Sequence, residues 1–478
     1  MLNWRNKIER NNEPALKKRL AQIEDYLGRT GTAVVNRWSL DKKSEQGIHR
    51  FFRNRKMKAD TLIESIKQRC CSNCPTGHVL VIQDSTELNY NHLEGKLKVN
   101  DADIGLLSDN KSLGFLAHPS LAVDADSEVP FGLSEVLLFQ RPIGMADKTE
   151  RDYQSLAIED KESYKWLLSA QNSKACLKAA RELTIIADRE SDIYELFCQI
   201  PDNSTHLIIR SNYNRRVEGG QNIKQVLSQK TWEDGLKVKV CGHKNRTSRQ
   251  ADLRFRWASV EILRPESSAV RRQALKQYPA SVALQVIEIE ENAQTVPQGE
   301  QPIHWILWTT HQVEFVQQAI QIGKWYANRW WIEDLFRVIK TQGFEVESSQ
   351  FGSGQALKKL AVACLDQGWK VLLMRQERTG RAAHPASLCF SSEEQQFLNF
   401  MQPQLEGPTK KQQNPHEVDS LAWAVWLIAR LGGWKPADLD KRPPGVITLA
   451  RGLTNFYERF QGWKMALDFF NQKTNSDP

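Results

Sequence analysis

The chain lacks any apolar run close to the ~20 residues that a transmembrane helix requires. Its first seven residues contain no apolar centre of the kind that a signal peptide carries. It is also poor in cysteine, with eight in 478 residues, which is too few for a disulfide framework in a chain of this length. We therefore expect no membrane partner and a reducing, cytoplasmic location.

Metal-binding cysteine motifs are scarce as well. The only cluster is Cys70, Cys71 and Cys74 with His78, and no second ligand pair follows it at zinc-finger spacing. A zinc site at this cluster is therefore a minor alternative. The chain also shows no internal repeat.

What the chain does contain is a basic excess and many indole rings. The net charge is +8 and the isoelectric point is about 8.9. This excess is compatible with a polyanionic partner without proving one. The fifteen tryptophans supply core volume and flat faces on which nucleic-acid bases can stack. The length allows about two to four domains.

The first 72 residues are predicted to be helical and basic. The segment from His49 to Lys56 interleaves cations with aromatic residues, among them Arg50 and Arg53. Two interpretations stay open: a small module that reads DNA, or a solvated helical bundle with a basic face. We favour the first because of residues later in the chain.

Two apolar strands are each followed by an aspartate. Residues 78–83 are rich in β-formers and end at Asp84, and residues 183–187 end at Asp188. Strands near 114–123 and 132–139 and a helix over 162–178 lie between them. A carboxylate at the end of a strand either initiates a turn or belongs to a site. Two such aspartates in one sheet make the turn-only interpretation less attractive for both.

The predicted secondary structure changes twice in the second half of the chain. After a strand at 206–212, residues 212–310 are rich in predicted strands, which we interpret as a β-insertion in an α/β domain. Beyond Lys340 the chain is mainly helical. Segments 360–374 and 421–429 are apolar nearly all round, so we expect them to be buried or paired with another chain.

Residues 325–340 are predicted to form one amphipathic helix. At about 100° per residue, a phenol, a carboxylate and three cations then share an arc of roughly 80°. These residues are Tyr326, Arg329, Glu333, Arg337 and Lys340. One interpretation is a solvated helix with ion pairs such as Glu333 with Arg337. The other is a face that binds a metal through Glu333 and phosphates through its cations.

Asp84, Asp188 and Glu333 can converge at one edge of a sheet. Three carboxylates around two Mg²⁺ ions can drive in-line displacement at phosphorus, with one ion on the attacking oxygen and one on the leaving oxygen. Glycosidases also use paired carboxylates, but they do not need the Arg and Lys face beside Glu333.

Three motifs carry a specific resemblance. They are Asp84-Ser85-Thr86 after a strand, the segment 187–193 around Asp188, and Tyr326-x2-Arg329-x3-Glu333-x6-Lys340. Together they resemble the DDE triad and the YREK signature of the bacterial transposases of insertion-sequence family four. The similarity runs along nearly the whole chain, including residues 50–54 and 428–433.

The resemblance implies an α/β fold with an RNase H-like catalytic core interrupted by a β-rich insertion, flanked by helical domains. The expected boundaries are 1–72 for a helical domain that binds transposon ends, 73–375 for the catalytic domain with its insertion at about 212–310, and 376–478 for a helical dimerisation domain. The partners implied are double-stranded DNA, as transposon ends and target, and a second copy of the chain in a synaptic homodimer. The location implied is cytoplasmic and associated with the nucleoid.

The reaction implied is cut-and-paste DNA transposition by a Mg²⁺-dependent endonuclease and strand transferase, with Mn²⁺ as a substitute ion. It comprises nicking, hairpin formation, hairpin opening and strand transfer. Alternatives are a catalytically silent DNA-binding remnant or inhibitor, or a structure-specific nuclease of the same fold. The intact carboxylates and Lys340 argue against the remnant.

The resemblance also assigns roles residue by residue. Asp84, Asp188 and Glu333 match the catalytic metal ligands. Trp305 falls where the family places a ring that stacks on a flipped-out base, the alternative being a core tryptophan in a strand. Trp330 either packs on DNA or belongs to the core. The expected phosphate and DNA contacts are Tyr326, Arg329, Lys340 and Arg210 near the scissile bond, with Arg50 and Arg53 near the start of the chain.

Overall fold

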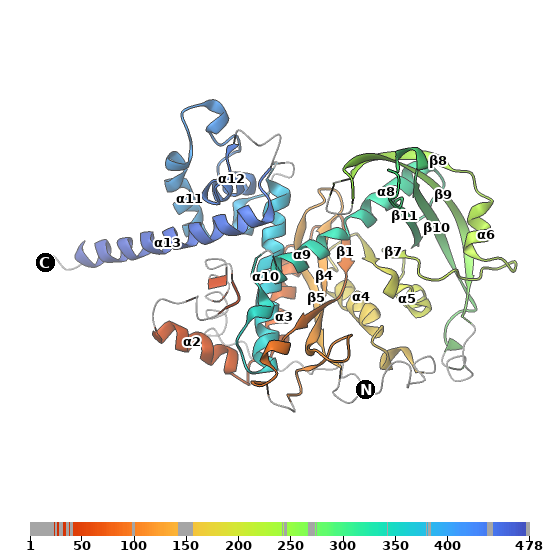
Figure 1. The fold of residues 1–478 in the computed structure, drawn as a ribbon, viewed down its shortest axis with the longest axis horizontal. Coiled ribbons are helices and arrows are strands. Elements are labelled where there is room, and N and C mark those ends of the chain that lie inside the picture. The colour runs from red at the N-terminus through yellow and green to blue at the C-terminus, as the bar shows by residue number, and fades with distance from the viewer. Residues whose placement is uncertain are drawn as a thin grey trace.

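The protein is described from a computed structural model, and it is a mixed α/β molecule built on one sheet of eleven strands (Figure 1). The structure describes residues 42–97, 101–141, 156–240, 246–265, 275–341, 343–378, 384–436 and 443–474, with the short pieces 23, 26–27, 32–34, 38, 242, 273 and 380. In this part of the chain, no helix combines the length and the apolar composition needed to cross a bilayer.

Five strands form the centre of the sheet in the order β5-β4-β1-β6-β7. The pairs β5–β4 and β4–β1 are antiparallel, whereas β1–β6 and β6–β7 are parallel. Four of these five strands precede residue 200, and all four were predicted and are confirmed. Residues 114–123 belong to one continuous strand, β4. The bounds are β1 His78–Gln83, β4 Leu113–Asp124, β5 Pro130–Phe139, β6 Glu182–Ala187 and β7 Thr205–Arg210.

Both faces of the central sheet are covered, which explains why every residue of β1 is buried. Alternate residues of a strand point to opposite faces. Leu80 and Ile82 therefore join a core with helices α3 (Ala59–Ser72) and α10 (Gly354–Glu377). Val79 and Val81 join a second core, with helices α4 (Tyr164–Cys176) and α5 (Tyr194–Gln199).

Short strands extend the sheet beside β4. Strand β2 (Thr86–Asn89) continues the chain just after Asp84 and pairs with the first half of β4. Strand β3 (Gly105–Leu106) also pairs with β4. The chain leaving Asp84 is thereby fixed to the sheet rather than free.

The strand-rich region predicted at 212–310 continues the same sheet. Strand β11 (His304–Thr309) pairs antiparallel with β7, and β10, β9 and β8 follow it outward. A short helix, α6 (Ile223–Ser228), precedes them. The bounds of the outer strands are β8 Glu233–Val240, β9 Arg249–Leu263 and β10 Ser281–Glu291.

The prediction of one helix over 325–340 is wrong. Helix α8 (Val316–Ala327) ends and helix α9 (Trp330–Lys340) begins with a turn at Asn328 and Arg329. Backbone bonds there span three residues instead of four, from the Arg329 N–H to the Tyr326 carbonyl and from the Ile332 N–H to the Arg329 carbonyl. This tighter winding redirects the chain. The apolar side of α9 is as predicted, with Ile332, Leu335, Val338 and Ile339 buried.

The helices at the two ends of the chain pack on α10. From the N-terminal part of the chain, helices α2 (Lys42–Arg53) and α3 contact α10. From the C-terminal part, helices α12 (Leu421–Leu431) and α13 (Val446–Thr474) contact it. Helix α11 (Ser392–Leu405) packs on α12. Both segments predicted to be apolar all round, in α10 and α12, are buried as expected.

Candidate active site

Asp84 and Asp188 lie side by side because their strands are parallel neighbours. The register pairs Ile82 of β1 with Ile186 of β6, and each aspartate comes two residues later. Each carboxylate accepts a hydrogen bond from the next backbone N–H, Ser85 at 2.7 Å and Arg189 at 2.6 Å. Contacts of this kind initiate a turn. Each of them occupies only one oxygen of its carboxylate, so the second oxygen of each aspartate can still take part in a site.

Arg329 links Asp84 to Glu333. Its Nη1 donates to the Asp84 Oδ2 at 2.9 Å, and its Nη2 donates to the Glu333 Oε1 at 2.6 Å. The guanidinium is almost fully buried, with 8% of the side chain exposed. A buried cation needs such partners, so the turn between α8 and α9 directs Arg329 inward to the carboxylates.

The electrostatics of Asp84 show that the three carboxylates are near one another. Burial, with repulsion from Asp188 and Glu333, raises the pKa of Asp84 to about 6. The Ser85 N–H and the Arg329 guanidinium lower the pKa and partly offset this. A cation brought next to this carboxyl group would stabilise its ionised form and lower its pKa.

The donor set at this site fits a hard divalent cation. Mg²⁺ prefers carboxylate oxygens and leaves positions for substrate oxygens. Within the described residues, however, the three carboxylates do not bring one oxygen each within 4.8 Å of the others. The Arg329 guanidinium lies between Asp84 and Glu333 and supplies the positive charge there. Metal binding would therefore require the Arg329 contacts to loosen.

Tyr326 and Trp305 form the aromatic side of the site. Their rings meet edge to face with centroids 5.1 Å apart. Burial raises the pKa of Tyr326 to about 12, with the nearby Arg329 acting in the opposite direction. Within the described residues the Tyr326 hydroxyl makes no hydrogen bond of normal geometry. Trp305 is half-buried and packs against the main core, so both the stacking and the core interpretations of this residue stay open.

Trp330 is exposed, which rules out the core alternative for this residue. About half of its surface, 49%, is open, and the Arg329 guanidinium lies 5.7 Å from its ring centroid. Arg337, on the next turns of α9, is also exposed, and it pairs with Asp334 at 2.5 Å more closely than with Glu333 at 4.0 Å. The ion pair predicted between Glu333 and Arg337 is thus present but long.

In the described part of the chain, the expected phosphate contacts Lys340 and Arg210 bond to neighbouring segments and not to the three carboxylates. The Lys340 Nζ donates to the Glu87 carbonyl oxygen at 2.6 Å and lies 3.4 Å from the Glu347 carboxylate. Arg210 ends β7 and lines a hollow of about 400 Å³, where its Nη2 donates to the His304 carbonyl at 3.4 Å. Lys340 therefore reaches the chain that leaves Asp84, and Arg210 borders the neighbouring hollow.

A groove of about 930 Å³ begins immediately beyond both aspartates. Ser85 and Arg189, the residues that follow them, line it. Its walls carry more cations than acids, which suits a polyanionic ligand. The cations are Arg141, Lys161, Lys165, Arg189, Arg215, Arg216 and Arg264, and the acids are Glu87, Glu162, Glu190 and Asp192.

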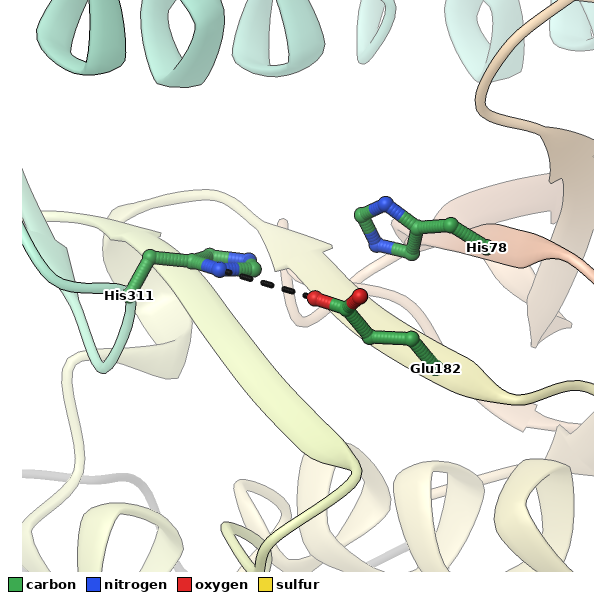
Figure 2. A group of neighbouring side chains, drawn as sticks. All are labelled: His78, Glu182 and His311. Carbon is green, nitrogen blue, oxygen red and sulfur yellow. Dashed lines mark ion pairs between the residues drawn. The ribbon is translucent and has the colours of Figure 1, made fainter.

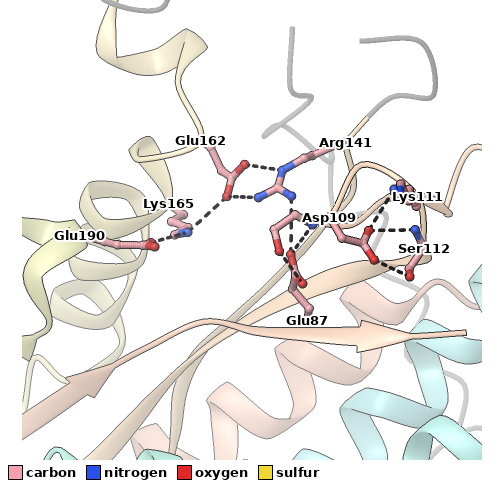
Figure 3. A network of polar contacts seen from close by, with 9 residues as sticks. Glu87, Asp109, Lys111, Ser112, Arg141, Glu162, Lys165 and Glu190 are labelled. Atoms are coloured by element: carbon pink, nitrogen blue, oxygen red, sulfur yellow. Dashed lines mark hydrogen bonds and ion pairs between the residues drawn. The ribbon is translucent and has the colours of Figure 1, made fainter. Parts of the chain in front are cut away.

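Ion pairs fix part of this groove wall (Figure 3). Arg141 holds Glu162 through two hydrogen bonds of 2.7 and 2.9 Å and lies 3.5 Å from Glu87. Lys165 lies 3.5 Å from Glu162 and 3.2 Å from Glu190. The network thereby connects residues that closely follow the two aspartates, since Glu87 comes three residues after Asp84 and Glu190 two after Asp188.

Arg50 and Arg53 are exposed on α2, while Phe51 and Phe52 between them are buried. The alternation of cations and aromatics therefore reflects a helix with one buried and one solvent-exposed side. Both arginines are available to a partner. They belong to the helix that packs on α10, and the carboxylates lie on other elements.

Sequence reasoning missed two features. It did not foresee the groove wall, because Arg141 and Lys165 have no motif around them. It also missed a cluster of His78, Glu182 and His311 (Figure 2). His78 was considered with Cys70, Cys71 and Cys74, yet these cysteines form no metal-type group with it within the described residues.

No protein-family model matches this chain.

Proposed function

We propose that this chain is a DNA transposase of the DDE type that cuts and joins DNA with Asp84, Asp188 and Glu333. The observation that carries the proposal is the convergence of these three residues, which lie far apart in the sequence, around Arg329 beside a groove rich in cations. An ordinary structural ion pair would not require a third carboxylate and a groove of this charge at the same place.

The topology supports an RNase H-like core for the proposed enzyme. Strands β5, β4 and β1 are antiparallel and β1, β6 and β7 are parallel, so the two aspartates leave adjacent parallel strands on the same edge. We assign the helices before β1 to the proposed end-binding region and those after α10 to the proposed dimerisation region. The proposed boundary at 72 falls at the end of α3, and the one at 375 lies in the last turn of α10.

Asp84, Asp188 and Glu333 would hold the Mg²⁺ ions, which when bound activate the attacking oxygen and stabilise the leaving oxygen at phosphorus. Arg329 keeps Asp84 and Glu333 together when no substrate is present, because it neutralises their repulsion. Tyr326 stays protonated at neutral pH and can donate a hydrogen bond to a phosphate oxygen.

The groove and the exposed ring account for DNA binding in this proposal. A strand that follows the groove passes the exposed Arg189, whose charge suits its phosphates, whereas the Arg215 charge is paired with Asp192 at 2.6 Å. Trp330 offers an open aromatic surface beside Glu333, and Trp305 offers a half-buried one beside Tyr326. Base stacking on such rings contributes about 1–3 kcal/mol per base. A homodimer would bring two ends together.

The product distribution on DNA tests the proposal. Labelled linear DNA that carries the sequences flanking the gene is incubated with the full chain and Mg²⁺. We expect nicks, then hairpins, and then joining to a second DNA. Nicks alone would identify a structure-specific nuclease, and end binding without any cleavage would identify a silent DNA-binding remnant. Either result would overturn the proposal.

A further inference from the structure

A second cluster of potential metal ligands lies at the other end of the strands that carry the aspartates (Figure 2). His78 opens β1, Glu182 opens β6 and His311 follows β11. One ligand atom from each residue lies within 4.8 Å of the others. Six residues of strand separate His78 from Asp84, or about 20 Å at the usual rise, so the cluster is distinct from the carboxylate site.

The two histidines of the cluster share a contact with Thr184, whereas the Glu182 carboxylate lies farther from the rings. The Thr184 hydroxyl lies 2.8 Å from the Nε2 of His78 and 2.8 Å from the Nε2 of His311. The hydroxyl can donate to one ring nitrogen and accept from the other, so it links the two rings in a fixed arrangement. The Glu182 Oε1 lies 3.8 Å from His311 Nδ1 and 3.6 Å from His206 Nε2, too far for a good hydrogen bond.

Aromatic rings enclose the cluster on one side. The Trp325 ring meets His78 edge to face at 4.7 Å and lies 5.3 Å from the His311 ring. The His206 ring stacks on His311 at 4.1 Å.

We propose that His78, Glu182 and His311 bind one divalent transition-metal ion of the zinc class. Two imidazole nitrogens and a carboxylate oxygen are a donor set that suits Zn²⁺, whereas Mg²⁺ prefers oxygen ligands in octahedral geometry. The Thr184 hydroxyl lies 2.8 Å from both rings, and it or a solvent water would complete four-coordination. The alternative is a hydrogen-bonded histidine cluster that needs no ion, and the test below separates the two.

The role that the geometry assigns to the ion is structural. It would join the starts of β1 and β6 to the segment that connects β11 with α8. Trp325, which covers the cluster, is followed directly by Tyr326, which contacts Trp305 at the carboxylate site. An ion at the cluster would therefore fix the end of α8, from which the chain turns to present Arg329.

Cobalt substitution tests the site in the full chain. The protein is freed of metal with a chelator and titrated with Co²⁺ in excess Mg²⁺, which occupies hard oxygen sites. We expect one Co²⁺ per chain with the visible bands of four-coordinate nitrogen and oxygen ligation. A thiolate-to-metal charge-transfer band would place the ion at cysteines such as Cys70 and Cys176 instead and would overturn the proposal.

Matched variants locate the binding. Glu182→Gln and His311→Gln should each weaken Co²⁺ and Zn²⁺ binding by at least about tenfold, the lower end of the loss seen for residues that merely support ligands. His92→Gln, at an exposed histidine outside the cluster, should bind as the wild type does. Wild-type affinity in both cluster variants would overturn the proposal.

Thermal unfolding gives an independent readout, because an ion that binds only the folded chain raises its melting temperature. Zn²⁺ should raise the melting temperature of the wild type and of His92→Gln, but not of Glu182→Gln. If His311→Gln does not fold, Glu182→Gln decides, because this side chain is 30% exposed and close in shape to glutamine. A wild-type protein that binds no Co²⁺ saturably would contradict the site. None of these measurements depends on DNA cleavage.

Discussion

At the scale of single residues, Arg329 is the group on which the carboxylate site depends. Its side chain is buried and touches both Asp84 and Glu333. A buried guanidinium with no carboxylate beside it would be costly, and Arg329 keeps Glu333 as a partner even when Asp84 is neutral. The spacing of the signature predicted that Arg329 and Glu333 act together. It did not predict that Arg329 is buried, since the expected face was open to solvent.

We predict that Asp84→Asn stabilises the metal-free protein at pH 8. The pKa of Asp84 is raised from 3.8 to about 6, mainly by burial, so the folded state takes up a proton more readily than the unfolded state. The ionised carboxylate therefore destabilises the fold above pH 6, by up to about 3 kcal/mol for a shift of about two units. The advantage of the variant should shrink from pH 6 to pH 4. Urea unfolding at several pH values measures it.

The control for that experiment has the opposite sign. Hydrogen bonds from Ser112 and the Lys111 N–H lower the pKa of Asp109 to about 2, so its ionised form stabilises the fold at pH 8. Asp109→Asn should therefore lose stability at pH 8 and not gain it. Equal stability of Asp84→Asn and the wild type at pH 8 would show that Asp84 is not a destabilised carboxylate.

We predict that Trp305→Ala separates hairpin formation from nicking. Trp305 is half-buried and contacts Tyr326, so truncation should leave the protein folded and nicking active, while hairpins fall because no ring receives the extruded base. Trp308→Ala is the matched control, since Trp308 is fully buried on the same strand. It should cost about 3–5 kcal/mol and reduce all activities together. If Trp305→Ala melts like Trp308→Ala and loses both products in parallel, its role is packing.

At the scale of elements, strands were easier to predict than turns. The apolar β-formers before Asp84 and Asp188 indicated two strands, and the equal position of each aspartate indicated a shared edge. The same alignment places His78 opposite Glu182, six residues before each aspartate, and the register confirms it. That signal was present in the sequence. His311 was not predictable, because its place beside them depends on β11 joining the sheet at β7.

The turn between α8 and α9 had no local signal. Neither Asn328 nor Arg329 is a glycine or proline, and both have right-handed helical backbone angles. The turn arises from tertiary contacts, since Arg329 reaches Asp84 and Trp325 packs on His78. Periodicity alone therefore predicted the right buried residues on α9 but an incorrect start for it.

We predict that Lys359→Met loosens α2. The buried Lys359 Nζ donates to the backbone carbonyls of Phe52 and Asn54, each at 2.8 Å, at the end of that helix. Its loss leaves buried carbonyls unsatisfied, at about 1–3 kcal/mol. Hydrogen exchange should show faster opening of residues in α2. Lys370→Met, at a half-buried position on the same helix, should change exchange in α2 little. If the amides of α2 exchange at the same rate in both variants, the Lys359 contact does not stabilise this helix.

At the scale of the whole molecule, one sheet connects the proposed catalytic core to the strands of 212–310. The β11–β7 pairing was not predicted. The many predicted strands in this region indicated an insertion but did not show which strand of the core it joins. A cation-rich groove and exposed arginines on α2 then lie on different parts of the fold. Under the proposed function, one long DNA molecule would engage both.

We predict that Arg50→Gln and Arg53→Gln weaken DNA binding without abolishing folding. Both side chains are exposed, so they should act on phosphates, and each loss should reduce the slope of log affinity against log salt by about one. Lys410→Gln, an exposed cation in the C-terminal part, is the control and should change neither affinity nor slope. Fluorescence anisotropy at several salt concentrations measures this. An unchanged slope in both arginine variants would place the end contacts elsewhere.

The central claim is that Glu333 belongs to a metal-dependent phosphoryl-transfer site, and single-turnover cleavage of labelled end DNA by Glu333→Gln tests it most directly. The variant should bind DNA as the wild type does but cleave at least about a thousandfold more slowly in Mg²⁺, since several kcal/mol of transition-state stabilisation depends on the ion. Glu345→Gln, at an exposed glutamate shortly after α9, should cleave normally. Wild-type cleavage by Glu333→Gln would contradict the account.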